Sequence, residues 1–247
     1  MKSFWSKTAL AAAALMCTAA AQAAVIDFES GVDLSLAPFA PLLADGDVVF
    51  QGNYFINTQD SKAGGGLIGQ LSNGSDPTSC LNGTCPTGDT TNFLSVYNDG
   101  LAHVGNANGG NVAFSSVSAA YIATPGNASG STVFFVVEGD RADGSYFAKY
   151  TALNTTGAFS TVGLTGGTTL GGSTGALSDK NFTDLFFWAY YCDGSSGSCN
   201  AFTTDKAQFA IDNIALDVAA VPEASTWALM LAGLGAVGAV VRRRRSV

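Results

Sequence analysis

The chain contains Val133-Phe134-Phe135-Val136-Val137 and Phe186-Phe187-Trp188-Ala189-Tyr190-Tyr191, two runs in which every residue is apolar or aromatic. Short runs of β-branched and aromatic residues favour strands over helices. Because successive side chains of a strand point to opposite faces, a run that is apolar throughout predicts a strand with little solvent on either side. We therefore expect central strands over Thr132–Glu138 and Leu185–Cys192.

Shorter runs of the same kind, separated by Gly, Asn, Asp and Ser, occur on both sides of these segments. Between residues 24 and 219 no long stretch shows the period of an amphipathic helix. This pattern predicts an all-β ectodomain, a single jelly-roll-like β-sandwich. Stretches 57–88 and 165–175 are expected to be loops. The other predicted strands are Val25–Glu29, Val48–Ile56, Asn92–Tyr97, Val112–Ser116, Ser118–Ala123, Ser145–Leu153, Phe159–Leu164 and Gln208–Leu216.

The run at 186–191 has two faces with different possible roles. Phe186, Trp188 and Tyr190 alternate onto one face of the predicted strand, where aromatic rings could form a platform for sugar rings. The residues between them are also apolar. Burial of this face in the core is therefore the interpretation that the sequence favours, and a binding surface is the alternative.

Residues 1–23 have the layout of a secretory signal peptide. Two lysines give a positive start, Thr8–Met16 is apolar but too short to span a bilayer, and Ala21-Gln22-Ala23 fits a cleavage site. We expect signal peptidase to leave Ala24 as the first residue. Lipidation at Cys17 is the alternative, but the bulky methionine before it does not suit a lipoprotein signal.

Residues 220–247 form a second targeting signal, which follows the predicted ectodomain at 24–219. The motif Val221-Pro222-Glu223 precedes an uncharged stretch over 225–241, and then come Arg242, Arg243, Arg244 and Arg245. At about 1.5 Å per residue the uncharged stretch suffices for a short transmembrane helix. The arginines would stop translocation and hold that end in the cytoplasm. A buried core helix is the alternative, which the arginine cluster disfavours.

This arrangement resembles the PEP-CTERM sorting signal of Gram-negative bacteria. The resemblance implies that an exosortase, a membrane transpeptidase, recognises the protein and cleaves it near Pro222-Glu223. It also implies an inner-membrane intermediate, followed by display at the cell surface or release outside the cell. Ala224 stands where the family usually has a second proline, so the match to the motif is incomplete.

The predicted ectodomain is strongly acidic. Between residues 24 and 219 there are 18 Asp and Glu residues against five Lys and Arg residues, a formal charge of −13. The full chain has a charge of only −8, because the remaining basic residues lie in the two terminal signals. Such a surface argues against binding of nucleic acid or of anionic lipid.

The ectodomain has four cysteines, an even number that indicates disulfides in an exported chain. Three pairings are possible, and the short spacings favour Cys80–Cys85 and Cys192–Cys199. A zinc site is the alternative. Neither spacing is the usual zinc-binding one, however, and His103 is the only histidine.

Ile26-Asp27-Phe28-Glu29 opens the ectodomain and Gln208-Phe209-Ala210-Ile211-Asp212-Asn213 closes it. These segments resemble the frame of galactose-binding-like jelly rolls and of several carbohydrate-binding modules. The resemblance implies that the first and last strands are neighbours and that Glu29 and Asp212 help to hold a structural calcium ion. The Gln-Phe-x-x-Asp pattern is also similar to that of a PEP-CTERM subgroup of unknown function. Clustered carboxylates suit calcium, which prefers oxygen ligands.

We predict no catalytic residue. Residues 64–69 match a dinucleotide-binding glycine pattern, but polar residues stand where a strand should precede it. Residues 171–175 match a nucleophile elbow without a following helix. His103 is interpreted as structural or exposed. The sequence thus predicts an exported surface or extracellular-matrix protein with a structural, adhesive or polysaccharide-associated role. A secreted hydrolase acting on polysaccharide is the alternative.

Overall fold

The computed structural model describes residues 24–60, 66–80, 85–124, 127, 129–203, 205–217 and 233. The predicted signal peptide at 1–23 lies outside the described residues, as do the motif Val221-Pro222-Glu223 and the arginines at 242–245. No helix within the described part of the chain is long and apolar enough to cross a bilayer.

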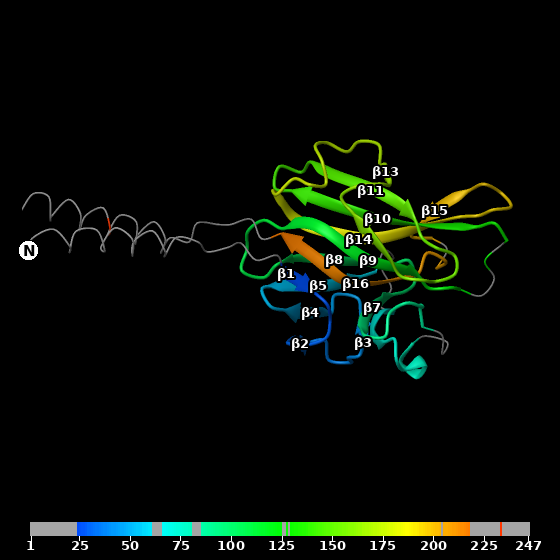
Figure 1. Ribbon diagram of the computed structural model, residues 1–247, viewed down its shortest axis with the longest axis horizontal. Coiled ribbons are helices and arrows are strands. Elements are labelled where there is room, and N and C mark those ends of the chain that lie inside the picture. The colour runs from blue at the N-terminus through cyan, green and yellow to red at the C-terminus, as the bar shows by residue number, and fades with distance from the viewer. Residues whose placement is uncertain are drawn as a thin grey trace, which may run out of the picture.

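Two antiparallel sheets pack face to face, which confirms the prediction of an all-β sandwich (Figure 1). The first sheet, sheet A, has the strand order β12 (Ser160–Gly163), β9 (Ala113–Tyr121), β16 (Phe209–Asp217), β7 (Asn92–Val96), β6 (Leu67–Asn73) and β3 (Leu42–Ala44), with β1 (Ala24–Ile26) also beside β16. The second sheet, sheet B, has the order β13 (Thr168–Thr169), β11 (Tyr146–Ala152), β10 (Thr132–Arg141), β14 (Phe182–Cys192), β8 (Leu101–Asn106), β5 (Tyr54–Gln59), β4 (Val48–Gln51) and β2 (Val32–Leu36), with β15 (Cys199–Ala201) beside β14. The short 3₁₀ helix η1 (Pro77–Ser79) follows β6.

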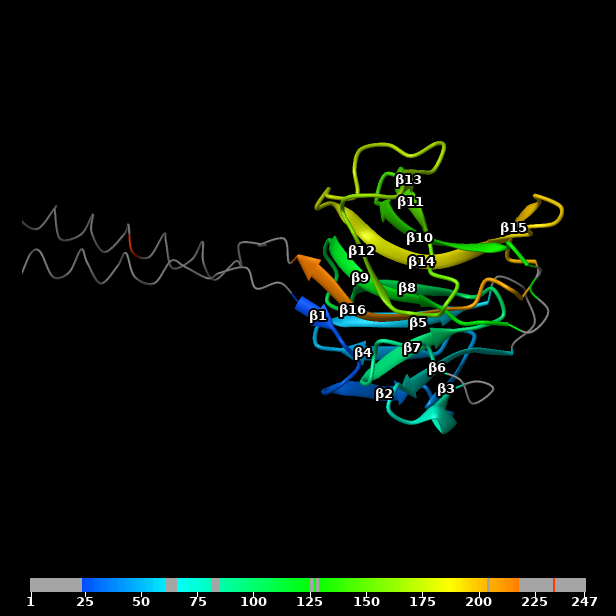
Figure 2. The same cartoon turned by 45° about the vertical axis from the view of Figure 1, so that its right-hand side comes forward.

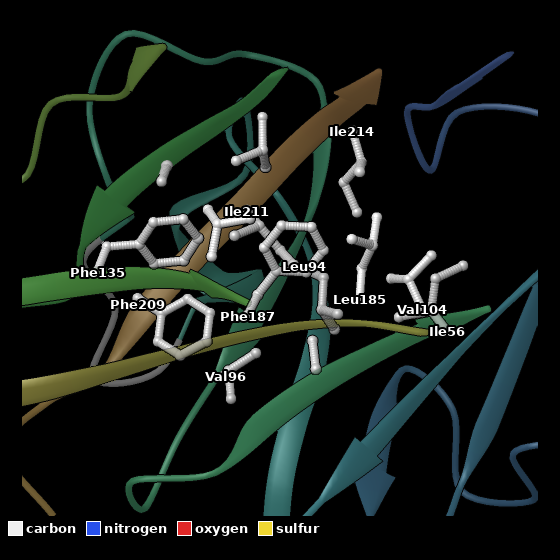
Figure 3. Packing of buried hydrophobic residues seen from close by; sticks show 14 of the residues in the cluster. Ile56, Leu94, Val96, Val104, Phe135, Leu185, Phe187, Phe209, Ile211 and Ile214 are labelled. Atoms are coloured by element: carbon white, nitrogen blue, oxygen red, sulfur yellow. The ribbon is translucent and has the colours of Figure 1, made fainter. Parts of the chain in front are cut away.

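The core lies between the two sheets and is rich in aromatic residues (Figure 3). The ring of Phe135 on β10 lies 6.0 Å from that of Phe187 on β14 and 5.3 Å from that of Phe209 on β16, measured between centroids. All three side chains are fully buried. As predicted, β10 and β14 lie inside sheet B, because each has a neighbouring strand on both edges.

The structure corrects several of the predicted strand boundaries. The predicted loop at 57–88 contains the end of β5 and the whole of β6, a strand whose apolar pattern begins directly after a run of glycines. The predicted strand Val48–Ile56 is a hairpin of β4 and β5 that turns at Gly52, where φ is 61°. The separate strands predicted over 112–123 form one strand, β9. The predicted loop at 165–175 contains the two-residue strand β13.

Strand β16 joins the two ends of the domain. One edge pairs with β9, while the other pairs with β7 from Phe209 to Ile211 and then with β1 from Ile214 to Leu216. The register against β9 shifts at this change of partner, and Asn213 has a φ of 49°. Such a bulge bends a strand and re-aims its side chains. The first and last strands are therefore neighbours, as the resemblance to galactose-binding-like folds implied (Figure 2).

Adjacent residues of β14 test the assignment of its two faces. We expect Phe187→Ala to lower the free energy of unfolding by about 3–5 kcal/mol, because it leaves a cavity in the core. Phe186→Ala should cost less, because Phe186 is only half-buried on the opposite face. Urea unfolding of both variants measures the difference, and equal losses would contradict the assignment.

Candidate ligand face and candidate cation site

The outer face of sheet B carries an aromatic surface. In β14 the core takes Leu185, Phe187 and Tyr191, so the alternate side chains point away from it. Opposite residues in paired strands share a face, and Tyr190 lies opposite Phe134 while Val136 lies opposite both Trp188 and Tyr150. We call this surface the aromatic face; its large side chains are those of Phe134, Tyr150, Phe186, Trp188 and Tyr190, all half-buried.

The aromatic face was wrongly interpreted as core. Phe186, Trp188 and Tyr190 reach the solvent side, whereas the residues that alternate with them fill the space between the sheets. Because both sets of side chains are apolar, the periodicity of the run could not distinguish the two faces. Apolar side chains grouped on the surface of a soluble protein are often functional, so this face is a candidate binding surface.

The rings of the aromatic face hold one another in fixed orientations. Tyr190 stacks on Phe134 with centroids 5.0 Å apart, and Tyr150 meets Phe134 edge-on at 5.5 Å. The ring centroid of Trp188 lies 5.1 Å from that of Phe202, a residue that follows β15. Burial, with the nearby Tyr150, raises the pKa of Tyr190 to about 12, so its hydroxyl keeps its proton at neutral pH. The face therefore offers rigid rings with hydroxyl groups at their edges.

Three carboxyl groups lie beside the aromatic rings. Glu138 and Asp140 share one face of β10, and Asp184 on β14 lies directly opposite Asp140. We call Glu138, Asp140 and Asp184 the carboxyl cluster. The indole nitrogen of Trp188 donates to Glu138 Oε2 at 3.1 Å, and His103 Nε2 lies 2.7 Å from Asp184 Oδ1. The buried Oδ1 of Asp140 has no hydrogen-bond partner among the described residues.

The carboxyl cluster is electrostatically strained. Burial raises the pKa of Glu138, although the hydrogen bond from Trp188 opposes this, and the nearby Asp140 raises it further. Burial also raises the pKa of Asp140, and so does the charge of Asp184. Like charges directly opposite each other in a sheet are destabilising. Within sheet B, the group placed to offset the repulsion between these carboxyls is His103, which lies beside Asp184.

His103 contacts the carboxyl cluster through Asp184 and also contacts two aromatic rings, those of Phe186 and Phe55. It lies on β8, a strand that sequence reasoning missed although Ala102 and Val104 alternate into the core. The imidazole stacks on Phe186 with centroids 4.6 Å apart and meets the ring of Phe55 edge-on at 5.0 Å. The interpretation of His103 as a structural residue stays a prediction, but its position places it at the edge of the aromatic face.

A second group of carboxyls lies where β16 changes partner. Asp212 precedes the bulge and is 1% exposed, and its Oδ1 has no hydrogen-bond partner among the described residues. Its Oδ2 accepts from the amide nitrogen of Asn213. The end of β1 brings Asp27 near, and the segment before β7 brings Asp89. We call Asp27, Asp89 and Asp212 the terminal-strand cluster.

Burial is the main cause that raises the pKa of Asp212 to about 8, and the carboxyls of Asp89 and Asp27 add to it. The Oδ1 of Asp89 accepts from the backbone N–H of Thr91 at 2.8 Å. Two carboxyls that face each other at a buried place can share a proton or share a cation. With its pKa raised to about 8, Asp212 is mostly protonated at neutral pH unless a cation is bound.

Glu29 lies beside this cluster but is held by a different partner. One of its carboxylate oxygens accepts from the backbone N–H of Asn92, and the side-chain amide of Asn92 lies 3.3 Å from the carbonyl oxygen of Phe28. The carboxyl neighbours of Asp212 are Asp89 and Asp27, which sequence reasoning did not single out. Among the described residues, no three His, Cys, Asp or Glu side chains are arranged to hold a metal ion.

Both predicted disulfides are present. Cys80 is bonded to Cys85, and Cys192 at the end of β14 is bonded to Cys199 at the start of β15. The second bond closes the hairpin whose outer strand leads to Phe202, next to Trp188. It therefore fixes one border of the aromatic face. No cysteine of the ectodomain is left for the zinc alternative.

Comparison with known proteins identifies the C-terminal segment. Residues 220–245 match the family model of the PEP-CTERM protein-sorting motif. This match indicates a protein that is exported towards the cell surface and processed by an exosortase. No curated protein matches the chain. A solved structure of a DUF4465 family protein from Bacteroides caccae is 14% identical and has a TM-score of 0.48, covering 79% of this chain and 98% of its own.

The raised pKa of Asp212 predicts a pH dependence. Without metal, the folded protein retains a proton on Asp212 that the unfolded chain releases above about pH 4, so Asp212 makes the free energy of unfolding fall as pH rises towards 8. The slope from one proton is at most about 1.4 kcal/mol per pH unit. Asp212→Asn should remove this slope.

Urea unfolding in a chelating buffer across this pH range measures the effect as the difference between wild type and variant. Carboxyls that do not interact with Asp212 contribute equally to both proteins and cancel in that difference. Parallel pH profiles for wild type and variant would contradict the assignment of a raised pKa to Asp212.

Proposed function

We propose that this exported protein binds polysaccharide at the cell surface or in the extracellular matrix, and that it does so without catalysis. The observation that supports this most directly is the aromatic face of sheet B. Sugar rings have apolar faces that pack on aromatic rings, while their hydroxyls hydrogen bond to carboxylates and tyrosines at the ring edges. Trp188, Tyr190 and the neighbouring Glu138 offer both kinds of contact.

The position of the aromatic face favours binding over turnover. Active sites are usually concave and enclosed, so that water can be excluded from the reacting groups. A pocket of this structure lies at the end of the strands, around Tyr121, Thr132 and Tyr191, and none of its lining residues belongs to the aromatic face. The face itself consists of side chains on successive strands of one sheet, a surface along which a polymer can extend.

The aromatic face can be tested by removing its only tryptophan. Trp188→Ala should weaken retention on insoluble polysaccharide by about tenfold or more, because a central ring and its edge contacts are lost. Co-sedimentation of the purified ectodomain with cellulose, chitin and chitosan provides the measurement.

Phe39→Ala is the matched control, because Phe39 is 72% exposed and lies outside sheet B. This variant should bind like wild type. If the wild-type ectodomain stays in the supernatant with all three polymers, the proposed function is wrong; release of sugars would instead favour the hydrolase.

We also propose that the terminal-strand cluster binds a structural calcium ion through Asp212 and Asp89. The supporting observation is the buried Oδ1 of Asp212, which has no hydrogen-bond partner among the described residues and faces a second carboxyl. These are oxygen donors of the kind that calcium takes, and backbone carbonyls and water usually complete its coordination. The ion would neutralise the pair and tie β16 to the segment before β7. Asp27 and Glu29 lie near enough to adjust under its charge.

Calcium should therefore stabilise the protein. At a hundredfold excess over its dissociation constant a ligand adds about 2.7 kcal/mol, which for a domain of this size raises the melting temperature by about 5–10 °C. Thermal unfolding in calcium and in chelator measures the shift. Asp212→Asn should abolish it and Asp143→Asn, in an exposed turn, should not. The same melting temperature with and without calcium would contradict the proposal.

A further inference from the structure

We infer that the aromatic face selects polysaccharides that carry free amino groups, such as polymers of glucosamine. This inference rests on the proposed function, because it concerns the kind of polymer that the same face binds. The feature that carries it is the carboxyl cluster, which lies at the end of the aromatic rings where Glu138 is opposite Phe186. An ammonium group placed there would meet carboxylates and ring faces together.

The carboxyl cluster has one basic neighbour, His103, whose Nε2 lies 2.7 Å from Asp184 Oδ1. Asp140 and Asp184 are cross-strand partners, and Glu138 lies two residues from Asp140 on the same side of β10. Besides His103, the strands of sheet B contain two basic residues, Arg141 and Lys149. Neither serves the cluster: Arg141 pairs with Asp179 at 2.7 Å, and the Lys149 ammonium donates to three carbonyls, those of Gly163, Thr165 and Gly166.

The missing positive charge can come from a ligand. The side chains of Glu138, Asp140 and Asp184 are part-exposed, and an ammonium group supplies three hydrogen-bond donors to such carboxylates. The adjacent rings strengthen the attraction, because a cation over an aromatic face interacts favourably with it. A glucosamine polymer combines this cation with the apolar ring faces that Trp188 and Tyr190 can stack against.

Charge complementarity also disfavours the binding of one class of polymer, the polyuronates. Polyuronates carry a carboxylate on each sugar, and placing one beside Glu138, Asp140 and Asp184 would add like charge to three carboxyls that have His103 as their basic neighbour. A neutral polymer would meet no such repulsion, but it would bring no positive charge to offset the repulsion among the three carboxyls. The order of affinity should therefore be amino sugar polymer, then neutral or N-acetylated polymer, then polyuronate.

Titration calorimetry with soluble oligomers tests this order. At about pH 6 the sugar amines are protonated, and glucosamine oligomers should bind the ectodomain about tenfold more tightly than N-acetylglucosamine oligomers of equal length. Oligogalacturonate should bind more weakly than both. The double variant Glu138→Gln/Asp140→Asn should lose the preference for the free amine and bind the two oligomers with equal affinity.

The variants are suited to the test because they keep the size of the side chains. A glutamine at 138 can still accept from the indole of Trp188, and removing like charges should leave the melting temperature equal or higher. If the double variant does not fold, Asp140→Asn alone is used. Asp217→Asn is the control, because Asp217 lies on sheet A and pairs with Lys180; it should retain the full preference.

The outcomes separate the inference from the proposed function. Equal affinity of wild type for the glucosamine and N-acetylglucosamine oligomers, with both lost in Trp188→Ala, would overturn the inference and leave polysaccharide binding standing. A preference that survives in the double variant would also overturn it, because the carboxyl cluster would then not be its source. Failure of wild type to bind any oligomer or insoluble polymer would overturn both.

Discussion

The change of partner along β16 is the constraint on which the rest of sheet A depends. A single strand pairs with β9 along one edge and is shared by β7 and β1 along the other, so it unites segments from the start, middle and end of the domain. Pairings of such large sequence separation form late and cost much chain entropy. Asp212 lies at the junction, where β1 and β7 leave a gap between their ends. A buried carboxyl at that point makes the junction sensitive to charge.

Sheet B meets a different constraint, because aromatic side chains occupy part of its outer face as well as its inner face. Phe135 and Phe187 meet sheet A, while Phe134 and Phe186 turn outward on the same strands. A protein that needed only a stable sandwich would place polar residues on the outer face. Departures from this pattern are expected at functional sites. The outer rings, the carboxyls beside them and the hairpin closed by Cys192 and Cys199 together form one surface, which is the one we propose as the binding site.

Local sequence signals predicted the elements better than their long-range arrangement. The central strands and both disulfides follow from short patterns, and the structure has them. The periodicity of residues 186–191 could not reveal which set of rings faces outward, because both sets are apolar. Asp89 gave no signal in the sequence, since its approach to Asp212 depends on the register of β7 against β16. Strand β6 was not predicted because a run of glycines, typical of a loop, precedes it. Strand β8 was not predicted because the polar His103 interrupts its short apolar pattern.

The neighbouring ends of the domain have a mechanical consequence. Ala24 lies opposite Leu216, so the chain enters and leaves the sandwich at the same end, and the hairpin of β14 and β15 lies at the other (Figures 1 and 2). A pull on the C-terminal side enters through β16, which is hydrogen bonded along both edges. The load is then shared in shear by several strands and is not taken by one edge pair that could unzip. A domain held at that end would resist a pull applied at the outer face of sheet B.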